Sequence, residues 1–195
     1  MSLQNMPMYK NIPWVLVSLR FLLTVPAVLF GYLGFTGLPY IVLLLAAAAT
    51  DYWDGKLARR QGAETALLRQ ADSIADTIFF LGVLGGMWFA YPAIYQQYAW
   101  GIYTIIALEV VRYGYDLTKF GRGASYHSLS AKVFGVSLLI ATLFIMGFGI
   151  SWLLYPAIAL GIVSEFEGLV ISILLHEWCY NVRHIGIAIK LRQQQ

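Results

Sequence analysis

The sequence predicts an all-α integral membrane protein with six transmembrane helices and a polar site that faces the cytoplasm. Three observations support this fold class. Of the 195 residues, 59% are hydrophobic and only 12% are charged, and the mean hydropathy of +0.68 is too high for a soluble domain of this length. Six apolar stretches are long enough to cross a bilayer. The basic residues collect in alternate connections between these stretches.

The six expected helices follow one another with short connections. Their apolar stretches are Trp14 to Phe35, Leu38 to Trp53, Ala71 to Tyr91, Ala93 to Tyr113, Leu129 to Gly149 and Ser151 to Leu175. We expect a single domain over residues 1–195. In it, residues 1–12 lie along the membrane interface, residues 13–176 form the six-helix bundle and residues 177–195 form a cytoplasmic tail.

The lysines and arginines determine the expected orientation. All 13 lie at the start of the first stretch, between the second and third, around the connection from the fourth to the fifth, or after the sixth. The connections 34–38, 91–97 and 147–152 contain none. Both termini should therefore face the cytoplasm. These cations fit an anionic lipid surface and a phosphate-bearing ligand better than nucleic acid.

Four aspartates stand at the facing ends of the second and third stretches. Asp51 and Asp54 share one face of a helix, and Asp72 and Asp76 share one face of the next. If residues 55–71 only turn the chain around, the two pairs meet. Like charges in a poorly hydrated site demand cations. We therefore expect two Mg²⁺ or Mn²⁺ ions about 4 Å apart, an arrangement suited to in-line displacement at phosphorus.

A plainer alternative is that these aspartates are solvated helix ends paired with Arg59, Arg60 and Arg69. Two spaced pairs of carboxylates at the membrane edge are poorly explained by solubility alone, which favours the metal site.

The run from Asp51 to Asp76 resembles the signature of the CDP-alcohol phosphotransferases, D-x-x-D-G-x-x-A-R-x8-G-x3-D-x3-D. The matching positions are Asp51, Asp54, Gly55, Ala58, Arg59, Asp72 and Asp76. Leu68 replaces the second glycine of the pattern, which in the family lies close to the bound nucleotide. This leucine crowds the cytidine, shifts its pose, or marks a relative that has lost activity.

The resemblance implies transfer of a phosphatidyl group from CDP-diacylglycerol, or a similar CDP-alcohol, to a small alcohol with release of CMP, a step of phospholipid biosynthesis. It implies that the four aspartates hold the two ions and that Asp76 also takes the proton of the acceptor. The nucleotide and diphosphate would contact Asp54, Gly55, Ala58, Arg59 and Leu68. A homodimer in a bacterial inner membrane is also expected from the resemblance.

A second polar cluster surrounds the connection from the fourth to the fifth stretch. Arg112, Lys119, Arg122 and Lys132 are expected on the same membrane face as the aspartates and are candidates to bind a phosphate on the acceptor. Glycerol 3-phosphate and inositol phosphate are therefore favoured, while inositol and serine stay open. Alternatively, Arg112 only pairs with Glu109, one helical turn away.

Arg20, Glu165 and Glu167 lie well inside the apolar stretches, where a charge is costly. Arg20 either snorkels to the interface or reaches the substrate or an aspartate. For one of Glu165 and Glu167, a structural bond to a neighbouring helix is favoured over a catalytic role.

Two other functions stay open. In the first, Leu68 has blocked the nucleotide, and the chain is an inactive relative that acts as a scaffold or subunit. In the second, the aspartates and Glu165 form the path of a divalent-cation transporter. The placement of all four aspartates at one side of the membrane argues against the transporter.

Overall fold

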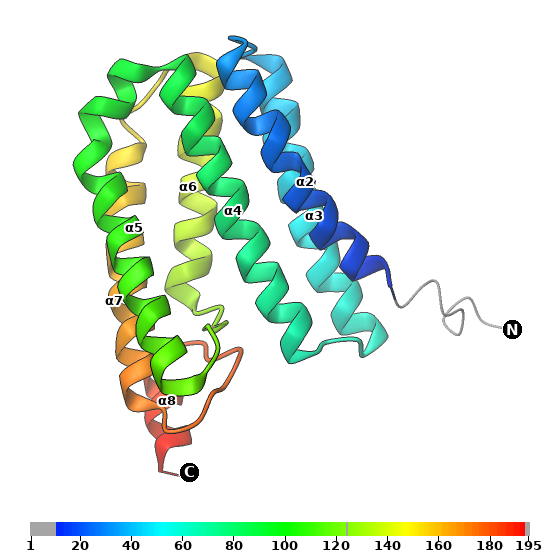
Figure 1. The fold of residues 1–195 in the computed structure, drawn as a ribbon, viewed down its shortest axis with the longest axis vertical. Helices are drawn as coiled ribbons and strands as arrows, with labels where there is room; N and C mark the ends of the chain where they lie inside the picture. Colours follow the sequence, from blue (N-terminus) through cyan, green and yellow to red (C-terminus); the bar gives the residue numbers. More distant parts are fainter. Residues whose placement is uncertain (1–10, 124, 194–195) are drawn as a thin grey trace, which may run out of the picture. The chain divides into compact units, whose positions relative to one another are not determined.

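The protein is described by a computed structural model that covers residues 11–123 and 125–193. These residues form seven helices and no strand (Figure 1). The helices are α2 (Ile12–Tyr32), α3 (Leu38–Gln61), α4 (Ala66–Ala90), α5 (Pro92–Phe120), α6 (Leu129–Phe148), α7 (Leu154–Leu174) and α8 (Ile185–Arg192). The all-α class predicted from the sequence is confirmed for this part of the chain.

Four of these helices, α2, α4, α6 and α7, are long and apolar enough to cross a membrane. This indicates a membrane protein. The helices α3 and α5 contain 24 and 29 residues, and at 1.5 Å per residue they measure about 36 and 44 Å. Both are therefore long enough to span a bilayer, but they are less apolar than the other four. The six-span topology and its orientation stay predictions.

The chain divides into two compact units, and each is described by itself. Among the described residues, the first unit contains residues 11–92 and 146–149, and the second contains residues 93–123, 125–145 and 150–193. The first unit therefore holds α2, α3 and α4, and the second holds α5, most of α6, α7 and α8. The predicted single domain over residues 1–195 stays a prediction.

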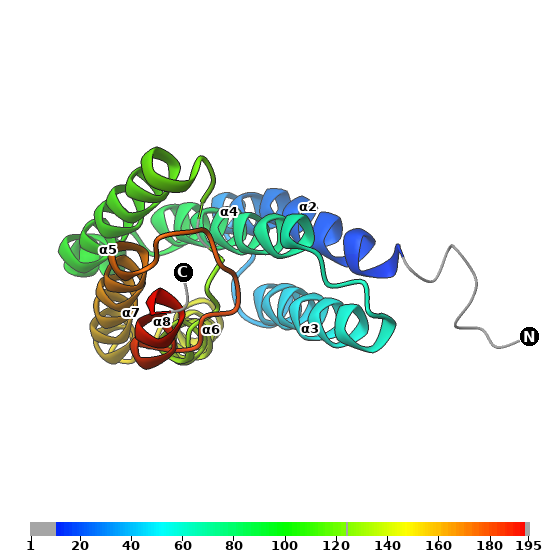
Figure 2. The same cartoon turned by 90° about the horizontal axis from the view of Figure 1, so that it is seen from below.

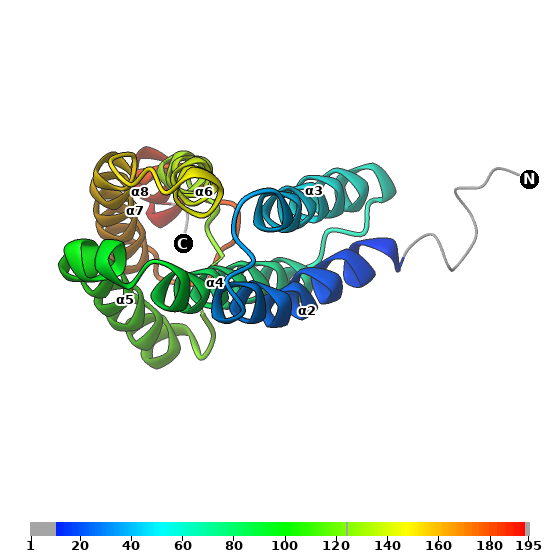
Figure 3. The same ribbon diagram turned by 90° about the horizontal axis from the view of Figure 1, so that it is seen from above.

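In the first unit, α2 packs against both α3 and α4. End-on views show α2 and α4 side by side, with α3 next to this pair (Figures 2 and 3). Small residues permit the approach: a Cβ atom at Gly82 of α4 would lie only 2.6 Å from Cγ2 of Thr24 on α2. The Tyr40 hydroxyl of α3 donates a hydrogen bond to the carbonyl of Ala27 on α2, at 2.8 Å.

The connection from α3 to α4 is much shorter than the sequence suggested. It contains residues 62–65 only, because α3 continues beyond Trp53 to Gln61 and α4 begins at Ala66 rather than Ala71. Hydropathy marks the apolar part of a helix, but Lys, Leu, Ala and Arg after Gly55 also favour helix. Gly62 ends α3 with a φ of 60°, and Oγ1 of Thr65 accepts a hydrogen bond from the amide of Leu68, which caps α4.

In the second unit, α7 contacts both α5 and α6. A Cβ atom at Gly161 of α7 would lie 2.7 Å from Cδ1 of Ile105 on α5 and 2.8 Å from Cε2 of Phe134 on α6. The short helix α8 was not predicted. It packs against the end of α7 through a buried cluster that includes Ile171, Leu175 and Ala188.

Candidate active site

The four motif aspartates lie at the same end of α3 and α4, close to the turn at residues 62–65. Asp54 and Asp72 are buried, whereas the side chains of Asp51 and Asp76 are 55% and 38% exposed. Carboxylate oxygens of Asp51, Asp72 and Asp76, one from each, lie within 4.8 Å of one another. Three oxygens at this spacing can surround one cation.

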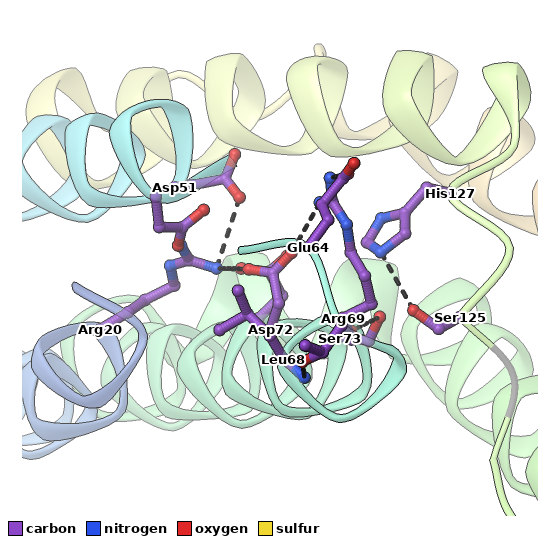
Figure 4. Close-up of polar contacts among 12 residues, drawn as sticks. Arg20, Asp51, Glu64, Leu68, Arg69, Asp72, Ser73, Ser125 and His127 are labelled. Carbon is purple, nitrogen blue, oxygen red and sulfur yellow. Dashed lines mark hydrogen bonds and ion pairs between the residues drawn. The ribbon is translucent and has the colours of Figure 1, made fainter. Parts of the chain in front are cut away.

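Arg20 of α2 lies at the centre of the aspartates (Figure 4). Its Nη1 atom is 2.8 Å from Oδ1 of Asp72 and 3.4 Å from Oδ1 of Asp51. The same atom also donates to Asp76, and Nη2 donates to Asp54. Of the two options left open by the sequence, snorkelling or contact with an aspartate, the structure shows the second.

The residues fit a divalent cation. Four carboxylates surround a single guanidinium, so Arg20 leaves the cluster with excess negative charge. Carboxylate oxygens are the hard ligands that Mg²⁺ and Mn²⁺ prefer. Arg69 adds a more distant charge, with its Nη1 atom 3.8 Å from Oδ2 of Asp72, but its Nη2 atom is paired with Glu64.

Four of the five residues expected to contact the nucleotide and diphosphate surround one small cavity. Asp54, Gly55, Ala58 and Leu68 line it, together with Val17, Arg69 and Asp72. Its volume is about 10 Å³, which is room for one water at most. The Leu68 side chain is 4% exposed and packs against Val17, Ala58 and Ala75. The leucine thus fills space that a glycine would leave open.

Arg59 lies beside this cavity, on the exposed side of α3. A Cβ atom at Gly55 would be 3.3 Å from Nη1 of Arg59, so the guanidinium folds back over the glycine. The missing side chain at residue 55 therefore leaves room for the Arg59 guanidinium directly after Asp54.

A comparison with protein families shows to which family the chain belongs. A family model described as CDP-alcohol phosphatidyltransferase matches residues 10–177. The chain belongs to this family. Neither a curated protein nor a solved structure matched the chain in two further comparisons. Membership supports phosphatidyl transfer in phospholipid synthesis, with a CDP-alcohol and an alcohol acceptor as substrate classes. Members depend in general on divalent metals, and the aspartates provide a place for one.

The four basic residues expected to bind the acceptor all lie in the second unit. Arg112 hydrogen-bonds to Glu165. Lys119 donates to the carbonyls of Ser172 and Ile173 at 2.8 and 3.0 Å, and so caps the end of α7. Arg122 lies over the ring of Trp178, at 5.0 Å. Lys132 is exposed in the first turn of α6.

Both glutamates of α7 bond to a neighbouring helix, whereas the sequence favoured such a bond for one of them. Glu165 accepts a hydrogen bond from Nε of Arg112 on α5, at 2.7 Å. Glu167 accepts one from the hydroxyl of Ser130 on α6. The family motif contains neither glutamate, and their contacts hold α5 and α6 to α7.

Proposed function

We propose that this member of the family moves the phosphatidyl group of CDP-diacylglycerol, or of a similar CDP-alcohol, to a small hydroxyl acceptor and releases CMP. The observation that carries the proposal is the convergence of the four motif aspartates at one end of α3 and α4 in a member of this family. Phosphorylated alcohols such as glycerol 3-phosphate or inositol phosphate are the first acceptors to test.

Asp51, Asp54, Asp72 and Asp76 would hold two Mg²⁺ or Mn²⁺ ions. When bound, such ions neutralise the charge of a diphosphate and of the displaced phosphate. The exposed guanidinium of Arg59 over Gly55 binds the diphosphate, since arginine presents a fixed fork of donors to phosphate oxygens. Ala58 and Leu68 border the cytidine.

The chemical step is one in-line displacement. The acceptor oxygen forms a bond to the phosphorus of the phosphatidyl group while the bond from that phosphorus to CMP breaks. Asp76 takes the proton of the acceptor hydroxyl, a role supported by its partly exposed carboxylate, which an incoming alcohol can reach.

The acceptor phosphate would bind to basic residues of the second unit. Arg122 and Lys132 are exposed and are the first candidates, whereas Arg112 and Lys119 also hold protein partners. The proposal places the protein as a homodimer in a bacterial inner membrane with its site facing the cytoplasm. The family resemblance and the distribution of basic residues support this part.

The small cavity favours a second candidate function. A volume of about 10 Å³ beside Asp54 does not admit a cytidine unless Leu68 moves. A relative blocked in this way would keep the fold and the aspartates without catalysis, and would act as a scaffold or subunit.

CMP release from CDP-diacylglycerol by the purified protein tests the proposal. The assay uses detergent micelles with Mn²⁺ or Mg²⁺, one acceptor at a time, and compares wild type with Asp76→Asn. Glu177→Gln is the matched control, because it replaces an exposed carboxylate outside the cluster. We expect release that depends on one acceptor, survives in the control and vanishes in Asp76→Asn. Folded wild-type protein that is silent with every acceptor would contradict the transferase and favour the blocked relative.

A further inference from the structure

One atom of Arg20 occupies the place where three carboxylates converge. Asp51, Asp72 and Asp76 are the residues whose oxygens lie close enough to share a metal ion. Nη1 of Arg20 contacts all three, at 3.4 Å from Asp51, 2.8 Å from Asp72, and through a hydrogen bond to Asp76. A cation bound by these three carboxylates would therefore compete with Nη1 for them.

The rest of the guanidinium is held in the same cluster. Nη2 donates to Asp54, the fourth motif aspartate. Arg20 is only 1% exposed, so its side chain is enclosed by the protein. A planar fork of donors can bind several carboxylates at once, which makes arginine well suited to neutralise such a cluster.

Arg20 also comes from a different helix than its partners. The aspartates belong to α3 and α4, and Arg20 belongs to α2, which packs against both. The contacts of its guanidinium therefore join the three helices of the first unit at the aspartates. Removal of this cation would leave two buried carboxylates, Asp54 and Asp72, without their closest positive partner.

We propose that Arg20 is a resident cation of the aspartate cluster that a divalent ion must displace in order to bind. Arg20 then has two opposing effects. It stabilises the metal-free protein, because it compensates the carboxylates, and it weakens metal binding, because the ion competes with Nη1 for the same oxygens. The inference rests on the proposed function only in that the cluster binds a divalent ion.

Titration of the purified protein with Mn²⁺ tests the competition. The protein is kept in detergent without any nucleotide, and free Mn²⁺ is followed by electron paramagnetic resonance. In Arg20→Met we expect the first Mn²⁺ to bind at least tenfold more tightly than in wild type. Arg60→Met is the matched control, because it removes one exposed cation from the last turn of α3, and its affinity should stay within twofold. Unchanged or weaker binding in Arg20→Met would overturn the proposal.

The unfolding temperature, measured with and without Mn²⁺, is a second test of the competition. Without metal, Arg20→Met should unfold at a lower temperature than wild type, and saturating Mn²⁺ should raise its unfolding temperature by more than it raises that of wild type. An equal rise in both proteins would overturn the competition. If Arg20→Met does not fold, Arg20→Lys decides. A lysine ammonium lacks the fork, so Mn²⁺ should bind at least threefold more tightly than in wild type, and an unchanged affinity would contradict the proposal.

The binding measurement separates this inference from the proposed transferase. Tighter Mn²⁺ binding in Arg20→Met, in a protein that releases no CMP with any acceptor, would support the competition and contradict the transferase. Acceptor-dependent CMP release with equal Mn²⁺ affinity in wild type and Arg20→Met would support the transferase and contradict the competition.

Discussion

Arg112 of α5 donates a hydrogen bond from Nε to Oε2 of Glu165 on α7, across 2.7 Å in the interior of the second unit. The two side chains are only 17% and 10% exposed. Asp116, one turn further along α5, is fully buried, and its Oδ2 atom lies 3.9 Å from Nη1 of Arg112. Arg112 therefore holds two helices of this unit together, whatever it contributes to an acceptor.

The first prediction concerns this ion pair. Glu165→Gln and Arg112→Met should each lower the free energy of unfolding by about 3 kcal/mol or more. The first removes the carboxylate that is hydrogen-bonded to Arg112, and the second removes the cation that faces both Glu165 and Asp116. The double variant should lose clearly less than the two single losses together. Thermal unfolding in detergent of the four proteins gives the coupling free energy. Additive losses would show that the two side chains do not stabilise each other.

The second prediction concerns the contact between α2 and α4. A Cβ atom at Gly86 would collide with the carbonyl of Ala27 and the hydroxyl of Tyr40, whereas one at Gly85 would lie 3.6 Å from Val28, an ordinary contact distance. Gly86→Ala should therefore destabilise the protein by about 1–3 kcal/mol. Gly85→Ala should be neutral or slightly stabilising, since alanine favours helix. Equal unfolding temperatures of the two variants would contradict this packing.

The sequence predicts the fold well where the signal is hydrophobic. Long apolar stretches identify α2, α4, α6 and α7 because burial in lipid requires an apolar surface. The ends of α3 and α4 were missed because polar residues interrupt the apolar pattern in 54–61 and at Arg69 and Gln70, although both segments are helical. The helix α8 was missed because eight residues in a polar tail give no strong period.

The sequence predicts those parts of the candidate site that depend on the spacing of residues within one helix. Residues three or four apart on a helix share a face, so the two aspartate pairs follow from their positions. The place of Arg20 does not, because it depends on how closely α2 approaches α4 at Gly82 and Gly86. The burial of Leu68 against Val17 likewise depends on the packing of separate helices.

The third prediction compares two neighbouring arginines of α3. Arg59 lies over Gly55, and Arg60 is exposed next to it in the same helical turn. If Arg59 binds the diphosphate, Arg59→Met should raise the KM for CDP-diacylglycerol at least tenfold. Arg60→Met removes the same charge from the same helix and should change the KM less than twofold. An equal effect of both changes would mean that only the total charge of this face matters.

The fourth prediction concerns Leu68, which fills the cavity beside Asp54, and uses Leu67 as its control. Leu68→Gly should open that cavity and strengthen CDP binding at least tenfold by calorimetry. It should also cost about 3 kcal/mol or more of stability, because a buried leucine is lost and glycine disfavours helix. Leu67→Gly carries the same helix cost at a side chain that is 65% exposed, and it should leave CDP affinity unchanged. CMP release gained only by Leu68→Gly would identify a blocked relative. CDP affinity that is equal in wild type and Leu68→Gly would mean that the nucleotide does not approach this leucine.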